Sequence, residues 1–122
     1  MSHKILVVDD SGLARRRVRG MLEEHGFVVE EAEDGMSALE RYFVDKPDLV
    51  LLDLVMKGMY GLDVLTKMRE MDPAARVIVI SADIQTSSHD MVAQAGATGF
   101  LNKPIDAEQL LAAVRSALGE PQ

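Results

Sequence analysis

The chain has 122 residues, 48% of them hydrophobic, which fits one globular domain and excludes a disordered chain. A formal net charge of −7 disfavours nucleic acid as a partner, and the lack of cysteine excludes disulfides and thiolate metal sites. The apolar run after the N-terminus is too short for a signal peptide, and no run is long enough to span a membrane. We therefore expect a soluble, cytoplasmic protein.

Five short apolar segments, each followed by a segment with helical periodicity, predict alternating strands and helices. The expected strands are 5–8, 27–29, 48–53, 76–80 and 99–101. The expected helices begin near Ser11, Asp34, Gly61, Thr86 and Asp106 and end by Gly26, Pro47, Met71, Gly96 and Gly119. Their apolar spacing predicts that His25, Phe43 and Met91 face the core together with their aliphatic neighbours. Five strand–helix repeats indicate an α/β fold, with a parallel sheet covered by helices on both faces.

Polar residues stand at the ends of four expected strands. Asp9 and Asp10 follow the first strand, Asp53 ends the third, Ser81 follows the fourth, and Lys103 comes soon after the fifth. The carboxyl ends of parallel strands meet at one edge of a sheet, where ligands bind, so we expect these side chains to converge. Three carboxylates in one crevice repel one another and need a cation, and oxygen ligands suit Mg²⁺.

This combination predicts phosphoryl transfer. A metal ion, an ammonium group and a hydroxyl group together stabilise the charge that develops on the oxygens of a phosphoryl group in transit. A carboxylate can be the attacking group and form an acyl phosphate. We therefore expect Asp53 to accept a phosphoryl group with the help of Lys103 and Ser81. Each residue alone could be an ordinary loop acid, helix cap or hydroxyl, and only their joint occurrence favours a site.

The chain closely resembles the receiver domain of response regulators in bacterial two-component signalling. The matching features are Asp9-Asp10, Asp53, Ser81, the loop 54–61 and the segment 96–104. The resemblance covers essentially the whole chain and implies a flavodoxin-like, doubly wound (βα)5 fold with strand order 2-1-3-4-5. It also implies a phosphoacceptor signalling domain rather than an enzyme.

The resemblance implies a role for each site residue. Asp53 takes the phosphoryl group from the phosphohistidine of a sensor histidine kinase or a histidine phosphotransfer protein. Asp10 binds Mg²⁺ directly, Asp9 assists partly through water, and Asp53 and the Val55 carbonyl complete the protein ligands. Lys103 holds phosphoryl oxygens.

The resemblance also implies a switch. Ser81 moves toward the phosphoryl group and Phe100 turns inward, which changes a surface formed by the fourth helix, the fifth strand and the fifth helix. That surface controls a downstream protein, as in chemotaxis-type or phosphorelay signalling. The Lys103-Pro104 bond is usually cis in relatives.

We expect residues 1–122 to form a single, monomeric receiver domain, because the chain ends at Gln122 with no room for an output domain. A Mg²⁺-dependent phosphohydrolase with Asp53 as nucleophile is the alternative, although its haloacid-dehalogenase type needs a second aspartate where this chain has Val55. A flavin-binding flavodoxin is a third reading, which Asp9-Asp10 opposes because these acids would repel the flavin phosphate.

Two further features concern the surroundings of the site. Lys57 occupies a position where the family often has proline, and we hypothesise that Lys57, Val55 and Asp83 tune the lifetime of the phosphate. The arginines of the first helix are interpreted as a solvated face, with a docking site for the kinase as the other reading. They are Arg15, Arg16, Arg17 and Arg19.

Overall fold

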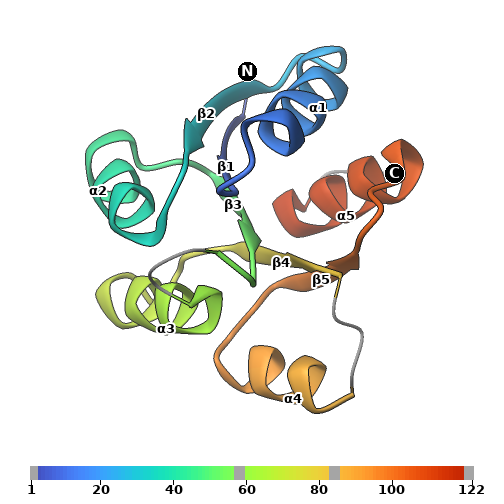
Figure 1. Ribbon diagram of the computed structural model, residues 1–122. Coiled ribbons are helices and arrows are strands. Elements are labelled where there is room, and N and C mark those ends of the chain that lie inside the picture. Colours follow the sequence, from blue (N-terminus) through green and yellow to red (C-terminus); the bar gives the residue numbers. More distant parts are fainter. Residues whose placement is uncertain (1–2, 57–59, 83–85, 120–122) are drawn as a thin grey trace.

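The computed structural model describes residues 3–56, 60–82 and 86–119, in which five strands alternate with five helices (Figure 1). The strands are β1 (Lys4–Val8), β2 (Val28–Ala32), β3 (Leu49–Asp53), β4 (Val77–Ser81) and β5 (Gly99–Asn102). The helices are α1 (Gly12–Glu23), α2 (Gly35–Asp45), α3 (Gly61–Met71), α4 (Thr86–Gln94) and α5 (Ala107–Leu118). None of the described helices is long and apolar enough to cross a bilayer.

All four strand pairings are parallel, and the order is β2-β1-β3-β4-β5. The predicted flavodoxin-like order is therefore confirmed. The chain winds outward in one direction from β1 to β2 and in the other from β3 to β5. In such sheets the crevice at the point of reversal, outside the carboxyl ends of the strands, is where ligands bind. Here that point lies between β1 and β3, the two strands that lead into Asp9 and Asp53.

Two hydrophobic layers hold the helices to the sheet. On one face, α1 and α5 pack on residues such as Ile5 and Leu51, and on the other face α2, α3 and α4 pack on residues such as Leu6 and Leu52 (Figure 1). Strands β3 and β4 are buried along their whole length, which explains why their sequences are continuous apolar runs rather than alternating ones.

Side-chain caps fix where three helices begin. Ser11 accepts a hydrogen bond from the N–H of Ala14, Asp34 from that of Ser37, and Asp106 from that of Gln109, at 3.2, 2.8 and 3.1 Å. Each bond satisfies an amide that the first helical turn leaves without a partner. The cap at Ser11 starts α1 directly after the two aspartates.

Three residues predicted to face the core are exposed. His25 lies beyond the end of α1 at Glu23, so the helical period no longer applies to it. Phe43 follows Tyr42 in the sequence and Met91 precedes Val92, and in each pair the neighbour faces the core. Phe43 and Met91 themselves are 52% and 48% exposed. Because successive helical residues are rotated by about 100°, Tyr42 and Val92 are buried instead.

The predicted bounds of the second strand were wrong. It runs from Val28 to Ala32 and not over 27–29, because two glutamates in its sequence conceal it. Glu30 and Glu31 pair with arginines of α2 and α1, which lets the edge strand carry charge.

Candidate functional site

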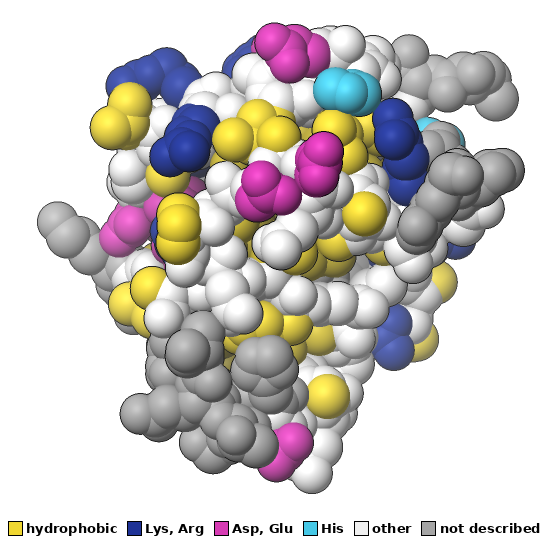
Figure 2. Space-filling model, turned by 90° about the vertical axis from the view of Figure 1, so that its right-hand side faces the viewer, with side chains coloured by type: hydrophobic (Ala, Val, Ile, Leu, Met, Phe, Trp, Pro, Cys, Tyr) yellow, Lys and Arg dark blue, Asp and Glu magenta, His cyan; other side chains and the backbone are white. Residues whose placement is uncertain are grey.

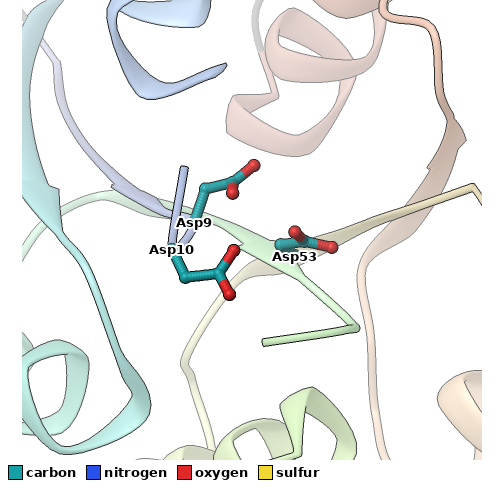
Figure 3. A group of neighbouring side chains, drawn as sticks. All are labelled: Asp9, Asp10 and Asp53. Atoms are coloured by element: carbon teal, nitrogen blue, oxygen red, sulfur yellow. The ribbon is translucent and has the colours of Figure 1, made fainter. Parts of the chain in front are cut away.

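Three carboxylates meet beyond the ends of β1 and β3. One oxygen from each of Asp9, Asp10 and Asp53 lies within 4.8 Å of the others, and all three side chains project to the same side of the strand ends (Figure 3). Asp9 and Asp53 are each only 6% exposed, whereas Asp10 is open to solvent. The expected convergence of the strand-end acids is therefore present.

The ammonium group of Lys103 lies between two of these acids. Its Nζ donates to Oδ2 of Asp9 at 3.1 Å and to Oδ2 of Asp53 at 3.2 Å. The backbone N–H of Lys103 donates to the carbonyl of Ser81 at 2.9 Å, which ties the segment after β5 to the end of β4. The Lys103-Pro104 bond is cis, as expected. Lysine and acids from three separate strand ends thus form one cluster.

Backbone amides hold the two buried carboxylates in place. Oδ1 of Asp9 accepts from the N–H of Ser11 at 2.9 Å, and Oδ1 of Asp53 accepts from the N–H of Val55 at 3.2 Å. The N–H of Asp9 in turn donates to the carbonyl of Ala32 at 3.2 Å. Each buried aspartate therefore has one oxygen on a backbone donor and the other on Lys103, so both oxygens of each carboxylate accept a hydrogen bond.

The electrostatic balance of the cluster is negative. Burial raises the pKa of the Asp53 carboxyl above its ordinary value and the charge of Asp9 raises it further, against the opposing effects of Lys103 and the Val55 N–H. Burial also acts to lower the pKa of Lys103, but the charges and hydrogen bonds of Asp53 and Asp9 outweigh it and raise that pKa. The ammonium is held charged, yet one positive charge does not offset three carboxylates.

The donor set fits a small, hard divalent cation. Three carboxylate groups supply oxygen ligands, and the exposure of Asp10 leaves an open side for water. Cysteine is absent from the chain, so no thiolate ligand competes. Val55, whose carbonyl is the fourth predicted ligand, adjoins the cluster through its N–H bond to Asp53. That the Val55 carbonyl binds metal stays a prediction.

The two predicted switch residues lie on neighbouring strands. Ser81 is fully buried as the last residue of β4 and is paired with Asn102 of β5. Phe100 lies on β5 opposite Val79 and packs, partly buried, against the α2–α4 side of the sheet. Lys57 and Asp83 lie outside the described residues.

One residue that contacts this site was misinterpreted from the sequence. Arg15 does not belong to a solvated face, because its Nη1 donates to the carbonyl oxygen of Asp9 at 2.6 Å and its Nε to Glu31 at 2.9 Å. Arg19 also reaches Glu31, at 2.6 Å. The spacing of four residues between these arginines places them on one side of α1, and this spacing is the signal that the sequence offered.

Comparison with known proteins decides the family. The family model of the response regulator receiver domain matches residues 5–115. The chain belongs to this family. The receiver domain is 40% identical over 119 residues to the chemotaxis protein CheY of Bacillus subtilis (strain 168), covering 97% of this chain and 99% of that protein. This protein is thus a response regulator of two-component signalling, and its domain is a signalling domain.

Two further similarities extend the comparison. The receiver domain is 38% identical over 118 residues to response regulator MprA of Mycobacterium ulcerans (strain Agy99), covering 97% of this chain and 51% of MprA. Among solved structures, it matches a chain of the CheX-CheY-BeF3-Mg²⁺ complex from Borrelia burgdorferi with a TM-score of 0.89 and 32% identity. That match covers 93% of this chain and 87% of the other.

Proposed function

We propose that this receiver domain accepts a phosphoryl group on Asp53, in a Mg²⁺-dependent reaction, from a histidine kinase or a histidine phosphotransfer protein. The observation that carries the proposal is the position of Lys103, whose ammonium group touches the carboxylates of both Asp9 and Asp53. A cation placed against the acceptor carboxylate suits a reaction that brings phosphoryl oxygens to that same point.

In the transfer step, a carboxylate oxygen of Asp53 attacks the phosphorus atom of the donor. A P–O bond forms and the P–N bond breaks, with its electron pair going to the imidazole nitrogen. Lys103, now on Oδ2 of Asp53, moves its donors to the oxygens of the arriving phosphoryl group. Ser81, at the end of the adjacent strand β4, donates a hydrogen bond from its hydroxyl group to another of these oxygens.

The acidic residues would hold the metal ion that this reaction needs. Asp9, Asp10, Asp53 and the Val55 carbonyl are the proposed ligands, and Mg²⁺ bound there would supply positive charge against the repulsion between phosphoryl oxygens and carboxylates. Asp9 and Asp53 each keep one oxygen on a backbone N–H, which holds the ligand set together before an ion arrives.

A groove beside Asp53 suits the docking of a phosphodonor protein. It has a volume of about 450 Å³ and extends from Asp9, Asp53 and Lys103 along the side of α1. Its far part is lined by apolar side chains, among them those of Leu13 and Ile105, and Leu13 is 72% exposed. An apolar groove next to the acceptor can bury part of a partner helix while the phosphohistidine reaches Asp53.

The output surface is proposed to be α4, β5 and α5. On the side of the molecule seen in Figure 2, hydrophobic side chains are open to solvent between acidic and basic ones. Met91 on α4 is 48% exposed. In the Borrelia burgdorferi complex, CheY is found together with CheX, BeF3 and Mg²⁺. By analogy, the phosphorylated form of this receiver would bind a downstream protein.

The phosphoacceptor role is tested by incubating the protein with acetyl phosphate and Mg²⁺ and measuring its intact mass. We expect one added phosphoryl group in the wild type and none in Asp53→Asn. The matched control is Asp63→Asn, which alters an exposed carboxylate on α3 and should leave the gain in mass unchanged.

Two results would contradict the proposal. The first is a phosphoryl group that still appears in Asp53→Asn, and the second is a reaction that proceeds fully when EDTA removes the metal ion. Hydrolysis of a stable phosphate ester over many turnovers would instead support the phosphohydrolase reading.

A further inference from the structure

Arg15 connects the acidic cluster to the edge strand of the sheet. Its Nη1 donates to the backbone carbonyl of Asp9 at 2.6 Å, and its Nε donates to Oε1 of Glu31 on β2 at 2.9 Å. The side chain is only 17% exposed, so both bonds are largely shielded from water. A short, charge-assisted bond to a carbonyl in such a place is among the stronger hydrogen bonds of proteins.

The other end of this connection is itself held firmly. Oε2 of Glu31 accepts from Nη1 of Arg19 at 2.6 Å, and Arg19 also binds Glu23 at 3.1 Å. The hydrogen bond from Arg19 lowers the pKa of Glu31, and that from Arg15 lowers it further, against the effect of burial. Glu31 is therefore a fixed negative charge that anchors the guanidinium group of Arg15.

The carbonyl that Arg15 holds belongs to the peptide group between Asp9 and Asp10. This group is planar, so the direction of its carbonyl also sets the direction in which the backbone of Asp10 leaves. The N–H of Asp9 is held by Ala32 and its carboxylate by Ser11 and Lys103. Arg15 thus holds the carbonyl group of Asp9, through which the backbone continues to Asp10, the exposed member of the cluster.

We propose that Arg15 is a positioning residue for the metal site, which aims the Asp10 carboxylate at the ion by holding the Asp9–Asp10 peptide group against Glu31. This role rests on the proposed function, since it requires that the three aspartates bind Mg²⁺. Groups that orient metal ligands contribute strongly to affinity although they never touch the ion.

The test is a calorimetric titration of the full chain with MgCl₂, without any phosphodonor. Arg15→Met keeps most of the unbranched apolar stem of the side chain and removes its donors, and we expect the Mg²⁺ Kd to rise about tenfold. The matched control is Arg16→Met, which removes an exposed arginine of the same helix that contacts neither Asp9 nor Glu31. Its Kd should stay within about twofold of the wild type, a change smaller than the orienting effect.

A second variant and a second readout separate positioning from stability. Arg15→Lys can reach Asp9 or Glu31 but not both in the same way, so its Kd should fall between those of the wild type and Arg15→Met. It also serves as the test if Arg15→Met does not fold. In acetyl phosphate assays, the Mg²⁺ concentration for half-maximal rate should rise in both variants while the rate at saturating Mg²⁺ recovers.

The possible failures are distinct. An unchanged Mg²⁺ Kd in both Arg15 variants, with only a lower melting temperature, would assign Arg15 a structural role and overturn this inference alone. A wild type that binds no Mg²⁺ would overturn the proposed function and the role of Arg15 with it.

Discussion

Gly61, the first residue of α3, is pressed against the backbone of Leu54. Its N–H donates to the Leu54 carbonyl at 2.9 Å, and a β-carbon at position 61 would lie 2.6 Å from the α-carbon of Leu54. The same β-carbon would lie 2.7 Å from the carbonyl oxygen of Asp53. The start of α3 therefore closes directly onto the backbone that carries the proposed phosphoacceptor.

The close approach predicts that Gly61→Ala displaces the residues around Asp53. We expect a loss of about 2 kcal/mol of unfolding free energy, typical of inserting a methyl group where the neighbours cannot yield, together with slower phosphorylation by acetyl phosphate. Urea denaturation and intact mass measure the two effects. Gly20→Ala is the matched control, because nothing lies within 4 Å of a β-carbon there and alanine favours a helix. Equal behaviour of the two variants would contradict the prediction.

Lys103 supplies the second prediction. Its removal in Lys103→Met would leave Asp9 and Asp53 buried side by side without their counter-charge, and we expect the metal-free protein to lose about 2 kcal/mol. Mg²⁺ should then raise the melting temperature of the variant more than that of the wild type, because the ion replaces the lost charge and binds only the folded site.

Differential scanning fluorimetry with an added dye, with and without Mg²⁺, gives both quantities for Lys103→Met. Lys67→Met is the control, since Lys67 is exposed on α3 and should respond to Mg²⁺ as the wild type does. A variant of Lys103 as stable as this control in metal-free buffer would show that the two aspartates need no cation.

The sheet and the convergence of its polar ends could be predicted from the sequence for a definite reason. The runs of β3 and β4 are apolar along their whole length, so Asp53 and Ser81 stand out as the points where each strand leaves the core. Parallel topology then requires those points to share an edge. This prediction required only the ends of the strands and their order along the chain, and both can be recognised from the local sequence.

Side-chain directions within helices were harder to predict. Tyr42 and Phe43 are adjacent aromatic residues, and only the packing of α2 on the sheet determines that Tyr42 faces the core. The contacts of Arg15 could not be predicted from the sequence for another reason. One of its partners is a backbone carbonyl, which has no sequence signature. The other is Glu31, which lies 16 positions away on a strand whose predicted range, 27–29, ended before it.

Tyr42 provides a prediction with a defined pH dependence. Its hydroxyl donates to Oδ2 of Asp72 at 2.7 Å and so joins α2 to the residue that ends α3. The bond from Tyr42 lowers the pKa of Asp72, and the N–H of Ala74 lowers it further. Burial raises the pKa of Tyr42, with further increases from the bond to Asp72 and its charge.

The signs of these shifts limit the stabilisation to a window. A lowered pKa of Asp72 stabilises the fold above the carboxyl's unfolded pKa of about 4, and this stabilisation is lost as the pH falls through the folded value. A raised pKa of Tyr42 stabilises the fold below the phenol's unfolded pKa of about 10, and the effect is lost as the pH rises above it. Tyr42→Phe should therefore melt a few degrees below the wild type near pH 7, and the difference should shrink outside this window.

Melting curves by circular dichroism across pH measure the effect of Tyr42→Phe. Tyr60→Phe is the natural control, because Tyr60 is the other tyrosine of the chain, is 42% exposed and makes no side-chain cap bond. A difference between Tyr42→Phe and the wild type that stays constant at every pH would show that lost packing, rather than the bond to Asp72, is responsible.

Thr98 tests whether the edge of the sheet can be weakened without disturbing the site. Its hydroxyl oxygen accepts from the N–H of Val77 at 3.1 Å, and its own N–H donates to the Val77 carbonyl at 2.7 Å. Thr98→Val keeps the shape but leaves the buried amide of Val77 without an acceptor, at a cost of about 1–2 kcal/mol. Thr98→Ser retains the acceptor and should stay close to the wild type.

The effect of Thr98→Val should be confined to stability. Thr98 precedes β5, whereas Lys103 follows that strand at its other end, beyond the pairing of Ser81 with Asn102. We therefore expect urea denaturation to detect the loss, while the Mg²⁺ Kd and the rate of phosphorylation under native conditions remain those of the wild type. A weaker Mg²⁺ affinity in Thr98→Val, but not in Thr98→Ser, would mean that the start of β5 also sets the position of Lys103.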